Sequence, residues 1–144
     1  MYAAFSDFML ALDKLRANLQ TEKRYEEIIT HYMVAHEMAI ALYEQTSIVK
    51  DLVKIVASCE VIGDCKFALD LHEEALIYRL KTLEYFNRHI ELDPSMKKHE
   101  SSFLKKLIAS YNSMGDYLNE IGQPEKADKY YQLARDTKGK INPD

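Results

Sequence analysis

The chain has 144 residues, of which 47% are hydrophobic and 29% charged, a balance typical of one folded domain and not of a disordered segment. Its 19 basic and 23 acidic side chains give a formal net charge of -4. We expect no nucleic-acid partner, because binding to phosphates needs a basic excess. No uninterrupted apolar stretch of about 18 residues occurs, so we expect no membrane partner and a cytoplasmic location.

Apolar residues recur at helical spacing along six stretches of the chain. The expected helices cover residues 2–19, 25–44, 48–62, 65–92, 95–121 and 124–137. Gly63 is expected to stop the third helix and Asp64 to cap the fourth, which places Cys59 and Cys65 on either side of a turn as buried, reduced thiols. Only 4 glycines and 3 prolines interrupt the chain, which favours long helices.

The expected fold is therefore all-α, with about six helices in antiparallel hairpins that form a single domain over residues 1–144. The first hairpin covers residues 1–47, the second 48–93 and the third 94–144.

The third hairpin combines small and large residues in a characteristic order. Its small residues let two helices approach closely and its large residues fill the space beside them. The residues concerned are Tyr111, Met114, Gly115, Leu118, Ala127, Tyr131 and Ala134, with Gly122 at the turn. In this pattern the chain resembles the tetratricopeptide repeat (TPR) family. A degenerate earlier copy matches at Leu52, Ile55, Cys59, Gly63, Ala68 and Ala75, with Gly63 aligned to the turn residue Gly122.

The resemblance implies hairpins stacked as a TPR-like right-handed superhelix. The distance from Gly63 to Gly122 exceeds the usual repeat of about 34 residues. Lengthened repeats of this kind are similar to those of kinesin light chains and of bacterial signalling TPR proteins. The match is weakest in residues 1–47.

Candidate catalytic motifs are incomplete. The pairs His36–Glu37 and His72–Glu73 begin like a zinc-protease motif, but Ile40 and Leu76 stand where its second histidine belongs. We therefore expect no metal, no cofactor and no catalytic residue, and hence not an enzyme. An irregular helical bundle with a small enzymatic or ligand-storage role is the remaining alternative of that class.

The resemblance implies binding of a protein or peptide along the first helices of the hairpins. The polar residues expected to line such a groove are Lys50, Lys54, Lys105, Asn112, Asp116 and Asn119. Some TPR domains use lysine, arginine and asparagine at such positions to grip a C-terminal carboxylate. Asp116 would repel a carboxylate, so that specificity is not predicted. The alternative is that these side chains only form the solvated face of the helices.

We therefore expect a protein- or peptide-binding module. A regulatory sensor domain, which binds a signalling peptide and controls an enzyme or transcription factor, is the alternative. No clear polar helix caps the end of the sequence, which favours a fragment of a longer array or a homodimer.

Overall fold

The computed structural model describes residues 2–141, with side chains from residue 5 onward. Its helices are α1 (Tyr2–Thr21), α2 (Tyr25–Thr46), α3 (Val49–Ala68), α4 (His72–Leu92), the 3-10 helix η1 (Pro94–His99), α5 (Glu100–Glu120) and α6 (Pro124–Lys138). No strand occurs in this part of the chain. The fold is therefore all-α and repeat-like, as the periodicity predicts.

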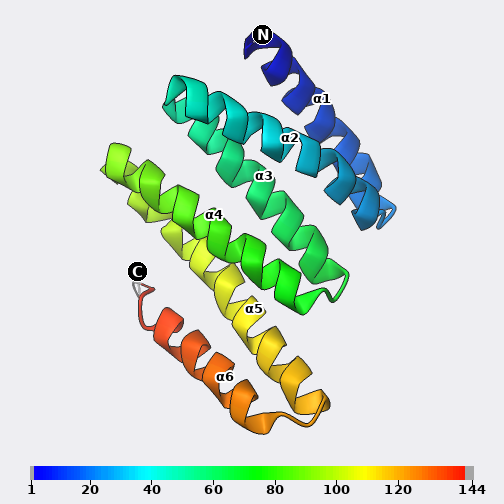
Figure 1. Cartoon of the computed structure of the whole chain (residues 1–144), viewed down its shortest axis with the longest axis vertical. Coiled ribbons are helices and arrows are strands. Elements are labelled where there is room, and N and C mark those ends of the chain that lie inside the picture. Colours follow the sequence, from blue (N-terminus) through cyan, green and yellow to red (C-terminus); the bar gives the residue numbers. More distant parts are fainter. Residues whose placement is uncertain (1, 142–144) are drawn as a thin grey trace.

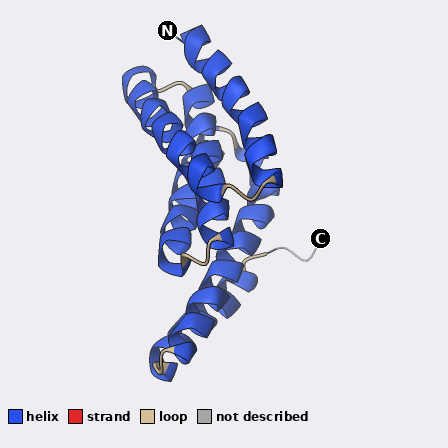
Figure 2. Ribbon diagram, turned by 90° about the vertical axis from the view of Figure 1, so that its right-hand side faces the viewer, coloured by secondary structure: helices blue, strands red, loops and turns tan. Residues whose placement is uncertain are grey.

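Consecutive helices run in opposite directions, so α1/α2, α3/α4 and α5/α6 form three antiparallel hairpins (Figure 1). The hairpins stack along one direction, with α1 at one end and α6 at the other (Figures 1 and 2). The first helix of a hairpin packs on the second helix of the hairpin before it, α3 on α2 and α5 on α4.

The turns within the three hairpins share one geometry. Lys23, Asp70 and Gly122 have φ values of 58°, 58° and 79°. The amide of the residue after each of them donates to a carbonyl of the preceding helix, with N–O distances of 2.8 Å for Arg24, 3.0 Å for Leu71 and 2.8 Å for Gln123. We call Lys23, Asp70 and Gly122 the turn residues. Residues at the same distance along the chain from a turn residue are equivalent in the three hairpins.

This register corrects the expected second repeat. Gly63 does not stop a helix, because α3 continues to Ala68 and turns at Asp70. Gly63 is buried within α3 and is equivalent to Gly115, not to Gly122. Asp64 caps no helix, and Cys59 and Cys65 lie on the same helix. The sequence carries no strong signal for this turn, because leucines flank Asp70 and no glycine or proline marks it.

Two further expectations are wrong. Ala68 is exposed at the end of α3, so it is not a packing residue. Residues 94–99 form η1 and not the first turns of a long helix, and α5 begins at Glu100. The side chain of Asp93 accepts hydrogen bonds from the amide of Ser95 at 3.2 Å and from its hydroxyl at 2.6 Å, which favours this tight turn.

Small residues set the spacing of the second and third hairpins. A Cβ atom on Gly115 would lie 2.6 Å from the ring of Tyr131, and one on Gly63 would lie 3.4 Å from Cγ of Arg79. The equivalent residue of α1 is Arg16, whose guanidinium lies 5.8 Å from the ring centre of Tyr32. Because a long side chain occupies this place, α1 and α2 approach each other less closely than the helices of the other hairpins.

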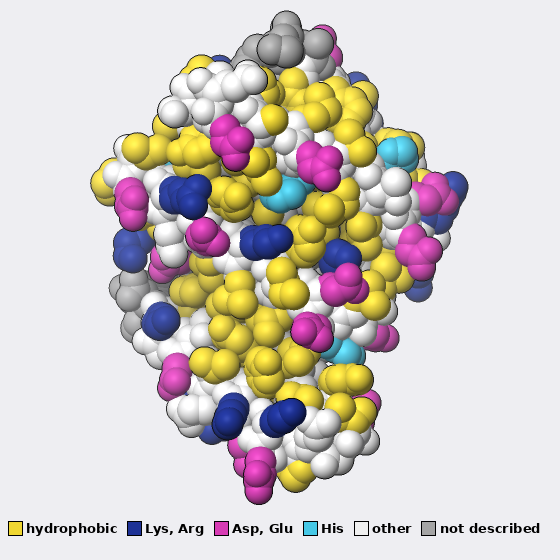
Figure 3. Space-filling model, viewed as in Figure 1, with side chains coloured by type: hydrophobic (Ala, Val, Ile, Leu, Met, Phe, Trp, Pro, Cys, Tyr) yellow, Lys and Arg dark blue, Asp and Glu magenta, His cyan; other side chains and the backbone are white. Residues whose placement is uncertain are grey.

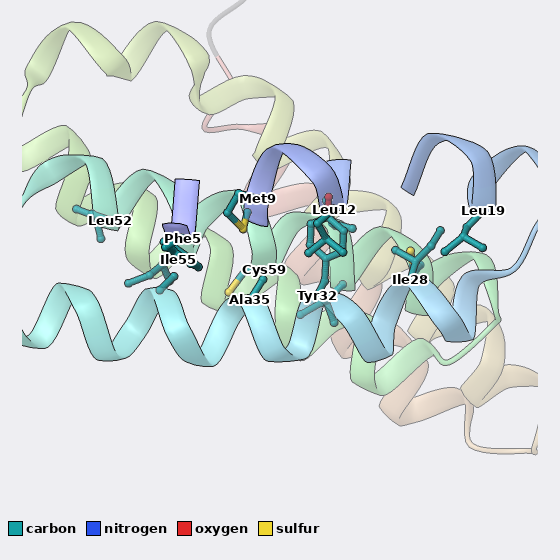
Figure 4. Close-up of a cluster of buried hydrophobic side chains, with 14 residues drawn as sticks. Phe5, Met9, Leu12, Leu19, Ile28, Tyr32, Ala35, Leu52, Ile55 and Cys59 are labelled. Carbon is teal, nitrogen blue, oxygen red and sulfur yellow. The ribbon is translucent and has the colours of Figure 1, made fainter. Parts of the chain in front are cut away.

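The larger core joins the first two hairpins (Figure 4). It includes Phe5, Met9, Leu12 and Leu19 of α1, Ile28, Tyr32 and Ala35 of α2, and Leu52, Ile55 and Cys59 of α3. A smaller core of Leu76, Leu107, Met114, Leu118 and Ala127 joins the last two hairpins. Burial of each large apolar side chain contributes roughly 1.5–3 kcal/mol. Packing between hairpins therefore holds the stack together.

Candidate functional site

The six polar residues expected to line a groove do not form one cluster. Lys50 and Lys105 are exposed, and so is Asn112. Lys54 is half-buried, and its Nζ lies 3.1 Å from Oγ of Ser6 and 4.9 Å from the ring centre of Phe5. Lys54 therefore lies at the contact between α1 and α3 and not on an open binding face.

Asp116 and Asn119 are tied to the second helix of their own hairpin. The hydroxyl of Tyr131 donates to Oδ1 of Asp116 at 2.5 Å and accepts from Nδ2 of Asn119 at 3.2 Å. The equivalents of Tyr131 are Arg79 and Tyr32. Arg79 pairs with Asp64 at 3.3 Å, and Tyr32 donates to Asp13. Each hairpin thus joins its two helices by a bond from this position to an aspartate, which is a structural role.

A charged cluster lies where α3, α4 and α5 meet. Arg79 is 8% exposed and donates to the backbone oxygen of Lys106 and to Oγ of Ser110, both at 2.9 Å. The Nζ of Lys106 lies 3.2 Å from Glu60 and 2.7 Å from Asp64. The opposite charges satisfy one another, so this cluster fixes how the second and third hairpins meet.

The buried thiols lie in apolar surroundings. Burial raises the pKa of Cys59 to about 12 and that of Cys65 to about 11, so both are neutral near pH 7. A neutral buried thiol is a poor nucleophile. His36 beside Cys59 shares a hydrogen bond with Oγ of Ser58 at 2.9 Å. This group is part of the core between the first two hairpins.

The outer side of α1 differs from its equivalents in α3 and α5. Leu15 is 40% exposed, whereas the equivalent Ile62 and Met114 are 0% and 7% exposed. Phe8 is 37% exposed, whereas its equivalents in α3 and α5, Ile55 and Leu107, are 0% and 5% exposed. On α3 and α5 this stripe is buried against the second helix of the preceding hairpin. On α1 the same stripe is apolar and uncovered.

An apolar groove lies between this stripe and α2. It has a volume of about 500 Å³ and is lined by Phe5, Phe8, Val34, Met38, Ala41, Leu42 and Gln45. Val34 is 51% and Met38 39% exposed, and both are on α2. We call this the open groove. Figure 3 shows other hydrophobic side chains exposed over α1, in the upper part of the face in view.

The opposite end of the stack is polar. The residues of α6 equivalent to Ile29, Met33 and His36 of α2 are Asp128, Gln132 and Arg135, all of them exposed. Gln132 donates to Asp136 at 2.7 Å and accepts from Arg135 at 2.8 Å. The expectation that no polar helix ends the sequence is therefore wrong, because α6 presents a polar outer face.

A second hollow, of about 670 Å³, is bounded by α4, α5 and α6. Its walls mix leucines such as Leu80 and Leu133 with Glu84, Asp136 and Lys140. It lies where α6 ends, because α6 is shorter than α2 and α4. None of the six polar residues expected to line a groove contributes to it or to the open groove.

No family model, curated protein or solved structure matches the chain. None of the described helices is long and apolar enough to cross a membrane. Within the described residues, no group of three or more histidine, cysteine, aspartate or glutamate side chains is placed to hold a metal ion.

The sequence does not reveal the open groove, because Phe8 and Leu15 share the helical spacing of the buried residues Phe5, Leu12 and Leu19. Val34, Met38 and Ala41 follow one another at helical spacing outside the buried stripe of α2. This second apolar stripe is the signal that could have revealed the groove.

Proposed function

We propose that the protein is a protein- or peptide-binding module and that the open groove is its binding surface. The observation that supports this most is the exposure of Phe8, Val34 and Met38 along one groove, at the end of a stack whose other end is polar. Contiguous exposed apolar surface with a polar surround is typical of a protein-interaction site.

The energetics favour a protein ligand. Covering each of these three side chains would contribute roughly 1 kcal/mol from the apolar area removed from water. Among the described residues that line the groove, Gln45 is the only one with a polar side chain. A ligand that fits would therefore present an extended apolar surface, as a protein segment does.

The TPR-like interpretation stays part of the proposal. The shared turn geometry and the small residues Gly63 and Gly115 support it. A cytoplasmic scaffold fits the two free, buried thiols Cys59 and Cys65, because reduced cysteines are usual in that compartment.

The test compares partner binding by three double variants. Val34→Glu/Met38→Glu places charges in the open groove, and Lys105→Glu/Asn112→Asp changes the polar stripe of α5. Ile77→Glu/Ile121→Glu is the matched control, because Ile77 and Ile121 are 43% and 48% exposed outside the groove. Circular dichroism should show the same helicity for all, since every substituted side chain is at least partly exposed.

A partner is first captured with the wild-type chain, then identified, purified and titrated against each variant by calorimetry. We expect the groove variant to bind at least about tenfold more weakly and the control to bind like the wild type. Equal affinity of the groove variant and the wild type would contradict the placement of binding in the groove.

A further inference from the structure

We infer that the open groove receives an amphipathic α-helix of a partner protein, and that this helix runs antiparallel to α1 and parallel to α2. The inference rests on the proposed function and specifies the ligand of the same groove. Its basis is that the chain contains two equivalent grooves, each of which already holds a helix.

In the first of these, α2 lies on α3 and α4. Ile29 and Met33 of α2 pack against the core that includes Ile55 and Ile62 of α3. The hydroxyl of Tyr78 on α4 donates to the sulfur of Met33 at 3.2 Å. The occupant thus contacts both helices of the hairpin that receives it.

In the second, α4 lies on α5 and α6. Leu76 of α4 is in one cluster with Leu107 and Met114 of α5, and Tyr130 of α6 packs against that cluster. Tyr130 is equivalent to Tyr78. The two occupied grooves therefore use equivalent residues, and each holds an amphipathic helix with a mainly apolar inner face. In the second groove α4 also leaves unfilled the hollow beside Leu107 and Leu133, which are equivalent to Phe8 and Val34.

The first hairpin presents the same surface without an occupant from the described chain. Phe8 and Leu15 of α1 stand where Ile55 and Ile62 of α3 meet α2. Val34 and Met38 of α2 are equivalent to Lys81 and Tyr85 of α4, on the side that faces the preceding hairpin. Both equivalent grooves receive a helix, so we infer that the ligand of the open groove is also a helix.

The direction follows from the same equivalence. Because helices alternate in direction along the stack, α2 is antiparallel to α3 and parallel to α4 (Figure 1). A helix in the open groove in the same pose is antiparallel to α1 and parallel to α2. Its N-terminus then lies beside the N-terminal half of α2, near His31, and its C-terminus near Gln45.

The acidic residues around the groove favour amphipathic helices with basic residues at their edges. Asp7, Glu37 and Glu44 are exposed, and each directly precedes a residue that lines the groove. Lys14, on the same flank of α1 as Asp7, offsets part of this negative charge. Each surface ion pair contributes only about 0–1 kcal/mol, so basic residues at the edges of the helix tune affinity while its apolar face provides most of it.

A second copy of the chain does not supply such a helix by continuing the stack. The face of α6 that would enter the groove carries Asp128, Gln132 and Arg135. Burying these groups in an apolar groove would cost free energy, because their hydrogen bonds to water would be lost without replacement.

The test uses three synthetic peptides with the folded chain. The first has leucines along one helical face and lysines at the edges of that face. The second has the same composition with the leucines spread around the helix. The third replaces the lysines with glutamates. Fluorescence anisotropy measures their dissociation constants for the wild type, Val34→Glu/Met38→Glu and the control Ile77→Glu/Ile121→Glu.

We expect the first peptide to bind the wild type and the control variant about tenfold or more tightly than it binds the groove variant. The second peptide should bind about tenfold more weakly than the first, and the third should also lose affinity. Equal binding of the first and second peptides would overturn the inference, because helical amphipathicity would then play no part.

The direction is tested with a spin label at either end of the first peptide. A label at its N-terminus should broaden amide signals near His31, and one at its C-terminus should broaden those near Gln45. The reverse pattern would overturn the inference.

Two more outcomes separate this inference from the proposed function. A natural partner that depends on Val34 and Met38 and binds as an extended segment would overturn the helix and keep the function. A dimer of the chain, seen by sedimentation and dissociated by Val34→Glu/Met38→Glu, would place a second copy in the groove and overturn the assignment to a partner helix.

Discussion

The two ends of the stack expose opposite sides of the contact that joins one hairpin to the next, and the two sides differ in chemistry. At the α6 end, Gln132 and Arg135 are exposed and bond to each other. At the α1 end, Leu15 and Val34 are exposed and apolar. The difference shows that the position of a residue in the repeat does not determine whether its side chain is buried or exposed. Equivalent residues are buried, solvated or left open according to whether a neighbouring hairpin covers them.

The sharpest way to test this contrast is to truncate equivalent side chains. Ile62 is fully buried and Leu15 is 40% exposed, although both are aliphatic and lie at the same repeat position. We expect Ile62→Ala to lower the free energy of unfolding by about 2–5 kcal/mol. We expect Leu15→Ala to lower it by less than about 1.5 kcal/mol. Urea unfolding followed by circular dichroism measures both. Equal losses would mean that the outer face of α1 is covered in solution.

The spacing of the hairpins gives the next largest effect. In Gly115→Ala, the new methyl group would meet the ring of Tyr131 at 2.6 Å, and such overpacking costs about 1–3 kcal/mol. In Gly63→Ala the nearest atom is 3.4 Å away, so the higher helix propensity of alanine should raise stability by up to about 1 kcal/mol.

Thermal unfolding of both glycine variants should therefore give shifts of opposite sign. Tyr131→Ala serves as the control, because Gly115→Ala should no longer destabilise a chain that lacks the ring. A loss that persists without the ring would show that Tyr131 is not the cause.

Part of this fold could be predicted from the sequence. Helical spacing identified the buried faces of most helices, and the Gly122–Pro124 turn was evident from its residues. The turn at Asp70 was not evident, because an aspartate between leucines carries no strong local signal for a left-handed backbone conformation. Assigning that turn to Gly63 shifted the register of the second repeat.

The candidate site was harder to predict than the fold. Phe8 and Leu15 are large apolar residues of the kind that form a core. They are exposed because no helix covers them. Such an absence is a property of tertiary arrangement and not of local sequence. The same holds for Asp116 and Asn119, whose engagement with Tyr131 depends on the packing of α6 on α5.

A smaller effect should appear in the pH dependence of stability. Burial lowers the pKa of His36 below its usual 6.5, and the positive charge of Lys81 acts in the same direction. The unfolded chain therefore binds a proton at His36 at higher pH than the folded chain does. The contribution of His36 to the free energy of unfolding is complete above pH 6.5 and declines as the pH falls towards the lowered pKa.

His36→Leu tests this prediction, because Leu83 stands at the equivalent position of the second hairpin. Urea unfolding between about pH 5 and pH 8 should give a shallower loss of stability on acidification for His36→Leu than for the wild type. The same slope for both chains would show that another group controls the acid sensitivity.

The smallest effect on stability is expected at the polar end. Gln132→Leu/Arg135→Leu changes exposed side chains and should alter the free energy of unfolding by no more than about 0.5 kcal/mol. It should nevertheless make the α6 end apolar like the α1 end, and promote self-association in sedimentation experiments. A double variant that stays monomeric would show that apolar surface alone does not make an end of this stack an interface.

The most direct test of the central claim is site-specific photo-crosslinking from both ends of the stack in cells. A benzophenone side chain placed at Val34 samples the open groove, and one at Gln132 samples the polar face of α6. We predict covalent adducts of the chain with a partner protein from position 34 and none from position 132. Adducts of equal yield from both positions, or from position 132 alone, would contradict the claim that the open groove is the binding surface.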